Sequence, residues 1–235
     1  MDSQKKMALS AMPDEKRHPG PFETSPQKSG NTGIDLNQLS FCYGTSPIFN
    51  NLSIAASARL TVLRGPSGCG KTTLLKLCMG ILQPSSGSIT PEHKKPVFIS
   101  QEDALFPWLT GMQNIQNVAG FSAEQVKTSP LYPRIQGFLE RRAHQMSFGQ
   151  RRLIEVARAL LVKPDLLCLD EPFNFIDPPS RALIQEVLME PPPHLRDVTI
   201  LVSSHYDSDF AAPGITTISF DGTLPVKNLV VSVKS

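Results

Sequence analysis

Alternating apolar and polar positions predict short β-strands early in the chain. Residues 34–41 alternate in this way, and a second short run covers residues 52–54 beyond a turn at residues 43–47. Residues 59–64 alternate for most of their length and end at Gly65, so we expect another strand there. The chain therefore begins its core with β-structure.

A helical period follows the third predicted strand. Its apolar face is formed by Leu74, Leu75, Leu77, Cys78, Ile81 and Leu82. Gly80 lies near the far end, where a helix is expected to weaken or stop. Residues 85–87, Ser-Ser-Gly, then predict a turn.

Three compact apolar runs predict buried strands at residues 96–100, 166–169 and 198–202. Such continuous runs are typical of parallel strands covered on both faces. Residues 106–161 are mostly helical in character, with interruptions at Pro130 and Pro133. A crossover helix is predicted around residues 183–188 and ends at the prolines 191–193. The pattern as a whole predicts an α/β fold.

Composition limits the domain count and the classes of partner. A chain of 235 residues suits one globular unit with room for a subdomain. Residues 1–33 are rich in Pro, Ser, Lys, Gln and Asp and predict a disordered tail, either without a role or regulatory. The net charge of +2 comes without a basic stripe, so nucleic acid is not an expected partner.

Cysteine usage and hydropathy bear on the compartment. The four cysteines, Cys42, Cys69, Cys78 and Cys168, lack C-x-x-C spacing and are interpreted as reduced, small hydrophobic residues of a cytosolic protein. No apolar stretch approaches the ~18 residues that span a bilayer, and the amino terminus lacks a hydrophobic signal segment. Membrane association is therefore expected only through a partner.

A glycine-rich segment carries the strongest chemical signal, since it fits G-x-x-x-x-G-K-[ST] at every fixed position. Its residues are Gly65-Pro66-Ser67-Gly68-Cys69-Gly70-Lys71-Thr72, followed by Thr73. Backbone N–H groups of such a loop point at phosphate oxygens, Lys71 adds a positive charge, and the Thr72 hydroxyl suits Mg²⁺. A chance glycine-rich turn is the alternative, but the flanking strand and helix favour a site for a nucleoside triphosphate.

Two adjacent carboxylates, Asp170 and Glu171, end the buried strand at residues 166–169. Ligands of open α/β sheets bind at the carboxyl ends of strands. Successive side chains point in different directions, so Asp170 can face Mg²⁺ beside Thr72 while Glu171 acts as general base on a water. Taken alone, the pair before Pro172 is more typical of a cap or turn.

With these motifs in place, residues 34 to about 222 resemble ATP-binding subunits of ABC transporters. The resemblance implies that Tyr43 stacks on adenine, that Gln101 contacts Mg²⁺ and water, and that His205 contacts the γ-phosphate and orients Glu171. Ser147-Phe148-Gly149-Gln150 matches the signature segment, and Asp177 matches the aspartate of the D-loop, which links two sites of a dimer. The alternative for Tyr43 is a core tyrosine. Without the other motifs, the signature is an ordinary helix start that Ser147 would cap.

The sequence departs from the family pattern at two places. Phe148 stands where the signature has its first glycine, and Asn174-Phe175-Ile176-Asp177 replaces Ser-Ala-Leu-Asp. We expect the first change to weaken or slow closure of the site, and the second to alter the coupling of the two sites. Residues 105–110, Leu-Phe-Pro-Trp-Leu-Thr, look like the stretch after the glutamine in nitrate, sulfonate and taurine importers. These aromatics predict either a permease-binding groove or local packing.

The resemblance implies a P-loop ABC ATPase with a mixed or parallel sheet, an antiparallel β subdomain and a small helical subdomain bearing the signature. The expected division is residues 34–104 and 164–235 for the core and 105–163 for the helices. The resemblance also implies a head-to-tail homodimer that hydrolyses ATP with Mg²⁺ and drives a membrane permease. The subunit would lie at the inner face of the membrane, bound to the permease, and a solute-binding protein would act through that permease. The alternatives are a soluble ABC ATPase without a permease and an ATP-binding regulatory subunit with weak hydrolysis.

Overall fold

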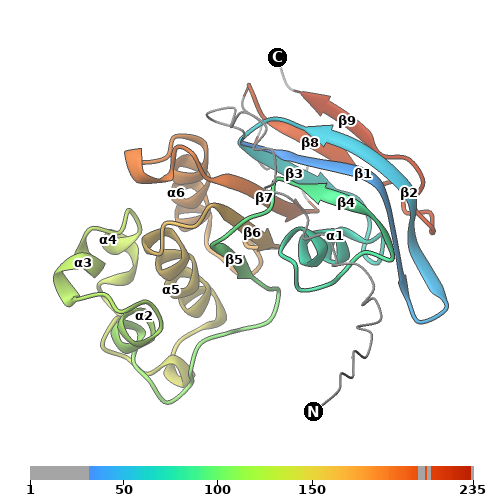
Figure 1. Ribbon diagram of the computed structural model, residues 1–235. Coiled ribbons are helices and arrows are strands. Elements are labelled where there is room, and N and C mark those ends of the chain that lie inside the picture. Colours follow the sequence, from blue (N-terminus) through green and yellow to red (C-terminus); the bar gives the residue numbers. More distant parts are fainter. Residues whose placement is uncertain (1–31, 206–209, 211–212, 234–235) are drawn as a thin grey trace, which may run out of the picture.

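The computed structural model describes residues 32–205, 210 and 213–233, which form two sheets (Figure 1). The larger sheet has the strand order β5-β6-β7-β3-β8-β9, and the smaller has the order β2-β1-β4. The strands of the larger sheet are β3 (Leu60–Arg64), β5 (Pro96–Ile99), β6 (Leu166–Asp170), β7 (Thr199–Ser204), β8 (Thr216–Ser219) and β9 (Val230–Val233). The predicted tail, residues 1–33, lies outside the described residues except for its last two.

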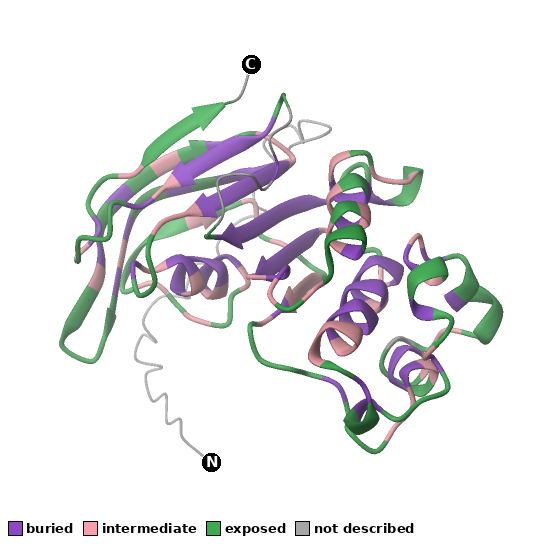
Figure 2. Ribbon diagram, turned by 180° about the vertical axis from the view of Figure 1, so that it is seen from behind, coloured by how far each residue is buried: buried purple, intermediate pink, exposed green. Residues whose placement is uncertain are grey.

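The larger sheet is parallel from β5 to β8, and β9 pairs with β8 in the antiparallel sense. Alternate residues of β6 face opposite sides: Leu167 and Leu169 pack with α5 (Phe148–Leu161) and α6 (Pro178–Met189). Leu166 and Cys168 pack with α1 (Lys71–Cys78) and the smaller sheet. Both faces are therefore covered, which explains the continuous apolar runs of β6 and β7; Figure 2 colours both strands as buried.

The smaller sheet is antiparallel and differs from the sequence prediction at two points. Its strands are β1 (Ile34–Tyr43), β2 (Ser46–Ala56) and β4 (Ser86–Thr90). β2 is longer than predicted because its pairing with β1 extends through polar, exposed positions. The predicted turn at residues 85–87 is wrong: these residues lead into β4, an edge strand whose exposed small residues carry no apolar period.

The helical segment between β5 and β6 gathers on one side of the molecule, away from the smaller sheet (Figure 1). It contains α2 (Gly111–Ala119), α3 (Ala123–Lys127), α4 (Tyr132–Ile135) and α5, with a 3₁₀ turn at Ala143–Gln145. Residues 106–161 are therefore mostly helical, as predicted; Pro130 lies between α3 and α4, but Pro133 lies in the first turn of α4 and does not interrupt a helix. α1 ends at Cys78, before Gly80 with φ of 70°, so Ile81 and Leu82 do not continue the predicted apolar face.

Three of the four cysteines are free and buried in the core, on strand, helix and loop positions, which fits their interpretation as small hydrophobic residues. Cys42, on β1, is free and exposed. Burial raises the pKa of Cys78 to about 12, which keeps this thiol protonated and unreactive. Within the described ranges, no helix combines the length and the apolar character that crossing a bilayer requires.

Candidate functional site

The glycine-rich segment Gly65 to Thr72, called the phosphate loop below, connects β3 to α1, as the sequence predicts. Gly65 has φ of 148°, and a Cβ there would lie 2.7 Å from Cβ of Phe220, so only glycine fits this turn. The ammonium of Lys71, whose residue is 5% exposed, donates hydrogen bonds to the carbonyl oxygens of Gly65 at 2.8 Å and Pro66 at 2.9 Å. The positive charge is thus held against the beginning of the loop, next to the amino terminus of α1.

Asp170 lies beside Thr72 at the carboxyl edge of the larger sheet. The Thr72 hydroxyl donates to Oδ2 of Asp170 at 2.7 Å, and the Ser203 hydroxyl donates to Oδ1 at 2.6 Å. The strands β6, β7 and β3 are parallel neighbours, so their carboxyl ends meet at this edge. A hydroxyl and a carboxylate in contact are the hard oxygen donors that Mg²⁺ prefers, and these residues fit that ion.

Glu171 leaves β6 with a left-handed backbone, φ of 49°, and its N–H donates to the Ser203 hydroxyl at 2.8 Å. Oε1 of its carboxylate contacts Nε2 of His205. Oε2 accepts hydrogen bonds from the side-chain amides of Gln101, at 3.2 Å, and Asn174, at 2.7 Å. Gln101 and His205, two of the residues predicted to be catalytic, therefore both contact the third, Glu171.

Two residues of this cluster were missed by the sequence analysis. Ser203 is wholly buried and joins Asp170 to the backbone of Glu171 through one hydroxyl. The only signal for it was a polar residue ending the apolar run of β7. Asn174 lies three residues after Glu171, and its backbone N–H reaches the Glu171 carbonyl oxygen at 3.4 Å, so a tight turn brings its amide back.

The predicted signature lies at the start of α5. The Ser147 hydroxyl accepts from the Gln150 N–H at 3.2 Å, and the Gln150 side chain accepts from the Ser147 N–H at 3.1 Å, which is a reciprocal capping box. A Cβ on Gly149 would lie 2.4 Å from the carbonyl oxygen of Phe175. The rings of Phe148 and Phe175 meet edge to face with centroids 5.0 Å apart.

Asp177 is close to the signature rather than to the phosphate loop. Asp177 caps α6 by accepting a hydrogen bond from the Ser180 N–H at 3.1 Å. Slight burial acts to raise the pKa of Asp177, but the hydrogen bonds from Ser180 outweigh it and the pKa is lowered. A cavity of about 350 Å³ is lined by both Asp177 and the signature residues Ser147, Gly149 and Gln150. Its lining includes none of residues 65–73, so the predicted site residues form two separate groups in this chain.

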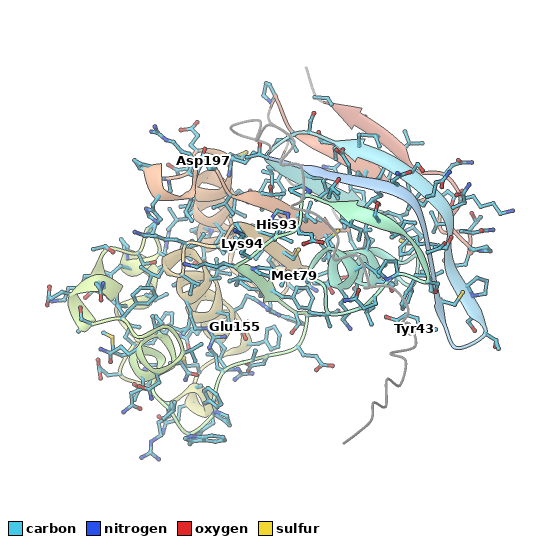
Figure 3. The ribbon with its side chains drawn as sticks, viewed as in Figure 1. Tyr43, Met79, His93, Lys94, Glu155 and Asp197 are labelled. Atoms are coloured by element: carbon cyan, nitrogen blue, oxygen red, sulfur yellow. The ribbon has the colours of Figure 1, made fainter. Side chains whose placement is uncertain are left out.

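Tyr43 lies at the end of β1, by the turn into β2 (Figure 3). It is 47% exposed, and its ring packs edge to face on Phe41 with centroids 4.9 Å apart. The start of β2 borders the phosphate loop, because a Cβ on Gly70 would lie 3.2 Å from Cζ of Phe49 and 3.3 Å from Cγ2 of Ile48. An exposed aromatic side chain is thus carried by the hairpin that flanks the loop.

The comparison with protein families decides the relationship of this chain. The profile described as "ABC transporter" matches residues 50–174, more than half of the chain and the segment that contains Lys71, Ser147 and Glu171. The chain belongs to the ABC transporter family. The predicted resemblance and the predicted fold class are therefore confirmed.

Individual relatives of this family member are named for import. The taurine import ATP-binding protein TauB of Yersinia pestis is 38% identical over 163 residues, which is 63% of this chain and 64% of the relative. The aliphatic sulfonates import ATP-binding protein SsuB of Bacillus cereus is 35% identical over 173 residues, 66% of this chain and 68% of the relative. The chain thus spans just under two thirds of the length of the TauB relatives it matches.

A solved structure supports the fold independently. An ATP-binding protein described as part of an ABC transporter, from Pyrococcus furiosus, superposes with a TM-score of 0.68 at 20% identity. The superposition covers 80% of this chain and 98% of that one. The two chains therefore share a fold.

Proposed function

We propose that this chain is the ATP-hydrolysing subunit of an importer and drives a small solute through a separate membrane permease. The observation that carries the proposal is the convergence of Gln101, Glu171 and His205 beside the Thr72–Asp170 contact. The names of the relatives, import ATP-binding proteins for taurine and aliphatic sulfonates, support import as the direction.

The chemistry consists mainly of positioning and charge neutralisation. The loop N–H groups, the amino terminus of α1 and the Lys71 ammonium bind the triphosphate, and Tyr43 stacks on adenine. Thr72 and Asp170 would hold Mg²⁺, with Gln101 close by; when bound, the ion offsets charge on the phosphate oxygens. Glu171 accepts a proton from the attacking water, while His205 and Gln101 keep its carboxylate oriented.

Assembly completes the site in this proposal. Two copies pair head to tail, so that the signature at the start of α5 in one copy binds the γ-phosphate held by the other. Residues 34–104 and 164–235 form the nucleotide-binding core, and residues 105–163 form the helical subdomain. Phe106 and Trp108, 42% and 64% exposed with ring centroids 5.6 Å apart, offer an apolar surface for a helix of the permease, which holds the subunit at the inner face of the membrane. A solute-binding protein would act through the permease.

The test is the Glu171→Gln variant of the full chain, measured beside wild type for ATP binding, ATP turnover and mass in solution. We expect wild type to hydrolyse ATP, and the variant to bind ATP, lose at least about a hundredfold in turnover and accumulate as an ATP-bound dimer. Glu124→Gln, an exposed carboxylate on α3, is the matched control and should retain wild-type turnover. Undiminished hydrolysis by Glu171→Gln would refute the assignment of the base, and ATP binding without hydrolysis by wild type would favour a regulatory subunit.

A further inference from the structure

The carboxylate of Glu171 has one partner that neither the family match nor the predicted motifs assign, the side-chain amide of Asn174. We infer that Asn174 is a positioning residue for Glu171, and that the ring contact between Phe148 and Phe175 fixes the loop that carries it. The inference rests on the proposed ATPase function and adds residues to its machinery.

The hydrogen bonds at Glu171 leave only one carboxylate oxygen available to a water. Oε2 accepts from both Gln101 and Asn174, at 3.2 and 2.7 Å, which occupies its two lone pairs. Oε1 contacts Nε2 of His205 and, among the described residues, keeps one lone pair without a partner. A carboxylate can only accept, so the amide nitrogen of Asn174 must face it. Asn174 therefore helps decide which oxygen receives the proton.

The loop after Glu171 is held in an unfavourable backbone conformation. Glu171 and Phe175 both have positive φ, 49° and 63°, a region that residues with a Cβ rarely adopt. Strained backbone conformations of this kind persist where contacts with the surrounding structure hold them in place, and they are common at functional sites. Contacts from outside the loop must therefore hold the turn that returns the Asn174 amide to Glu171.

The start of α5 supplies those contacts. The ring of Phe175, a residue that is 79% exposed, meets the ring of Phe148 edge to face, with centroids 5.0 Å apart and planes at 68°. The carbonyl of the same residue lies so close to Gly149 that a Cβ there would approach it to 2.4 Å. Phe148, where the chain departs from the signature, and Phe175, one of the positions where it departs from the D-loop pattern, are thus neighbours.

The same helix also fixes the second amide on Oε2. Arg152 donates to the carbonyl oxygens of Ser100 at 2.6 Å and Gln101 at 2.7 Å, and its guanidinium lies 5.5 Å from the centre of the Phe148 ring. Gln101 and Asn174 are therefore both anchored on α5, the first through Arg152 and the second through the loop that carries Phe175. The hydrogen bonds that Gln101 and Asn174 donate to Oε2 of Glu171 thus both depend on α5.

Turnover in variants of the full chain tests the inference. Asn174→Ala and the equally sized Asn174→Asp, which lacks the donor, should each lower kcat roughly tenfold or more with KM for ATP changed less than about twofold, because a hydrogen bond to a charged group is lost. Asn117→Ala, an exposed amide on α2, is the control and should match wild type. Wild-type kcat in Asn174→Asp, or a raised kcat in Asn174→Ala, would overturn the inference.

A double-variant comparison tests whether the Phe148–Phe175 ring contact holds the loop that carries Asn174. Phe175→Ala should lower kcat in the same direction, and the double variant with Asn174→Ala should be no slower than the slower single variant, because both changes remove one restraint. Fully additive losses would overturn the role of the ring contact. Thermal unfolding of each variant shows that the proteins compared are folded.

A readout that needs no hydrolysis separates this inference from the proposed function. The side-chain amide signals of Asn174 in ¹⁵N-labelled protein can be assigned by their absence in Asn174→Ala. They should shift in Glu171→Ala, which removes their acceptor, and stay in place in Glu124→Gln. Unchanged signals in Glu171→Ala would refute the contact even if wild type hydrolyses ATP, whereas an inactive wild type with shifted signals would refute only the ATPase.

Discussion

Replacing Arg152 by Met should cost about 4 kcal/mol of unfolding free energy. Arg152 is 1% exposed and donates to Oε2 of Glu155 at 2.8 Å as well as to two backbone carbonyls of the Ser100–Gln101 segment. Met fills a similar volume but leaves a carboxylate, 3% exposed, without its cation and two carbonyls without donors. Breaking a buried pair from one side costs about 3–5 kcal/mol, because an uncompensated charge remains.

Urea unfolding, followed by circular dichroism and by the fluorescence of Trp108, the single tryptophan, measures this loss. With a slope of about 2 kcal/mol per molar urea, the midpoint should fall by about 2 M. The double variant Arg152→Met/Glu155→Leu should recover most of the loss, since it removes both charges. Arg141→Met, an exposed arginine, is the control and should stay within about 0.5 kcal/mol of wild type. A loss below about 1 kcal/mol for Arg152→Met at unchanged slope would refute the reasoning.

Two further predictions concern packing and pH. Gly149→Ala should destabilise the protein by about 1–3 kcal/mol, because its Cβ would lie 2.4 Å from the Phe175 carbonyl oxygen. Gly137→Ala is the matched control, because no atom lies within 4 Å of a Cβ placed there. Equal melting temperatures for the two variants would contradict the close contact at Gly149. Burial raises the pKa of Glu155 above its ordinary 4.5, so above that pH the folded state keeps a proton that the unfolded chain has released. Stability should therefore fall as the pH rises from 4.5 towards the raised pKa, and less steeply in Glu155→Gln; identical slopes in urea midpoints measured from pH 4 to 8 would contradict this.

The part of the site that the sequence predicts is the part whose chemistry depends on local spacing. The phosphate loop with Lys71 and the carboxylates at the end of β6 are each contained in one short segment. Ser203 and Asn174 could not be assigned in this way, because their partners come from a neighbouring strand and a reversed turn. The ring of Phe148 was expected only to weaken the site; its contact with Phe175 depends on the packing of α5 against a distant loop.

The strands that the sequence predicts include those whose burial on both faces produces a continuous apolar run. β3, β6 and β7 carry apolar runs, because both of their faces are covered. β4 lies at a sheet edge and is largely exposed, so its small polar residues resemble those of a turn and only its pairing with β1 makes it a strand. β9 is also an exposed edge strand, and it was missed although its valines favour β-structure.

The uneven burial of the four cysteines gives this protein an intrinsic attachment point for a spectroscopic label. Among the four cysteines, Cys42 is exposed, whereas Cys69, Cys78 and Cys168 are buried in the core. A maleimide dye should therefore react at one position without any mutagenesis, directly beside Tyr43. Its emission would report, in real time, any molecule that settles against that aromatic ring.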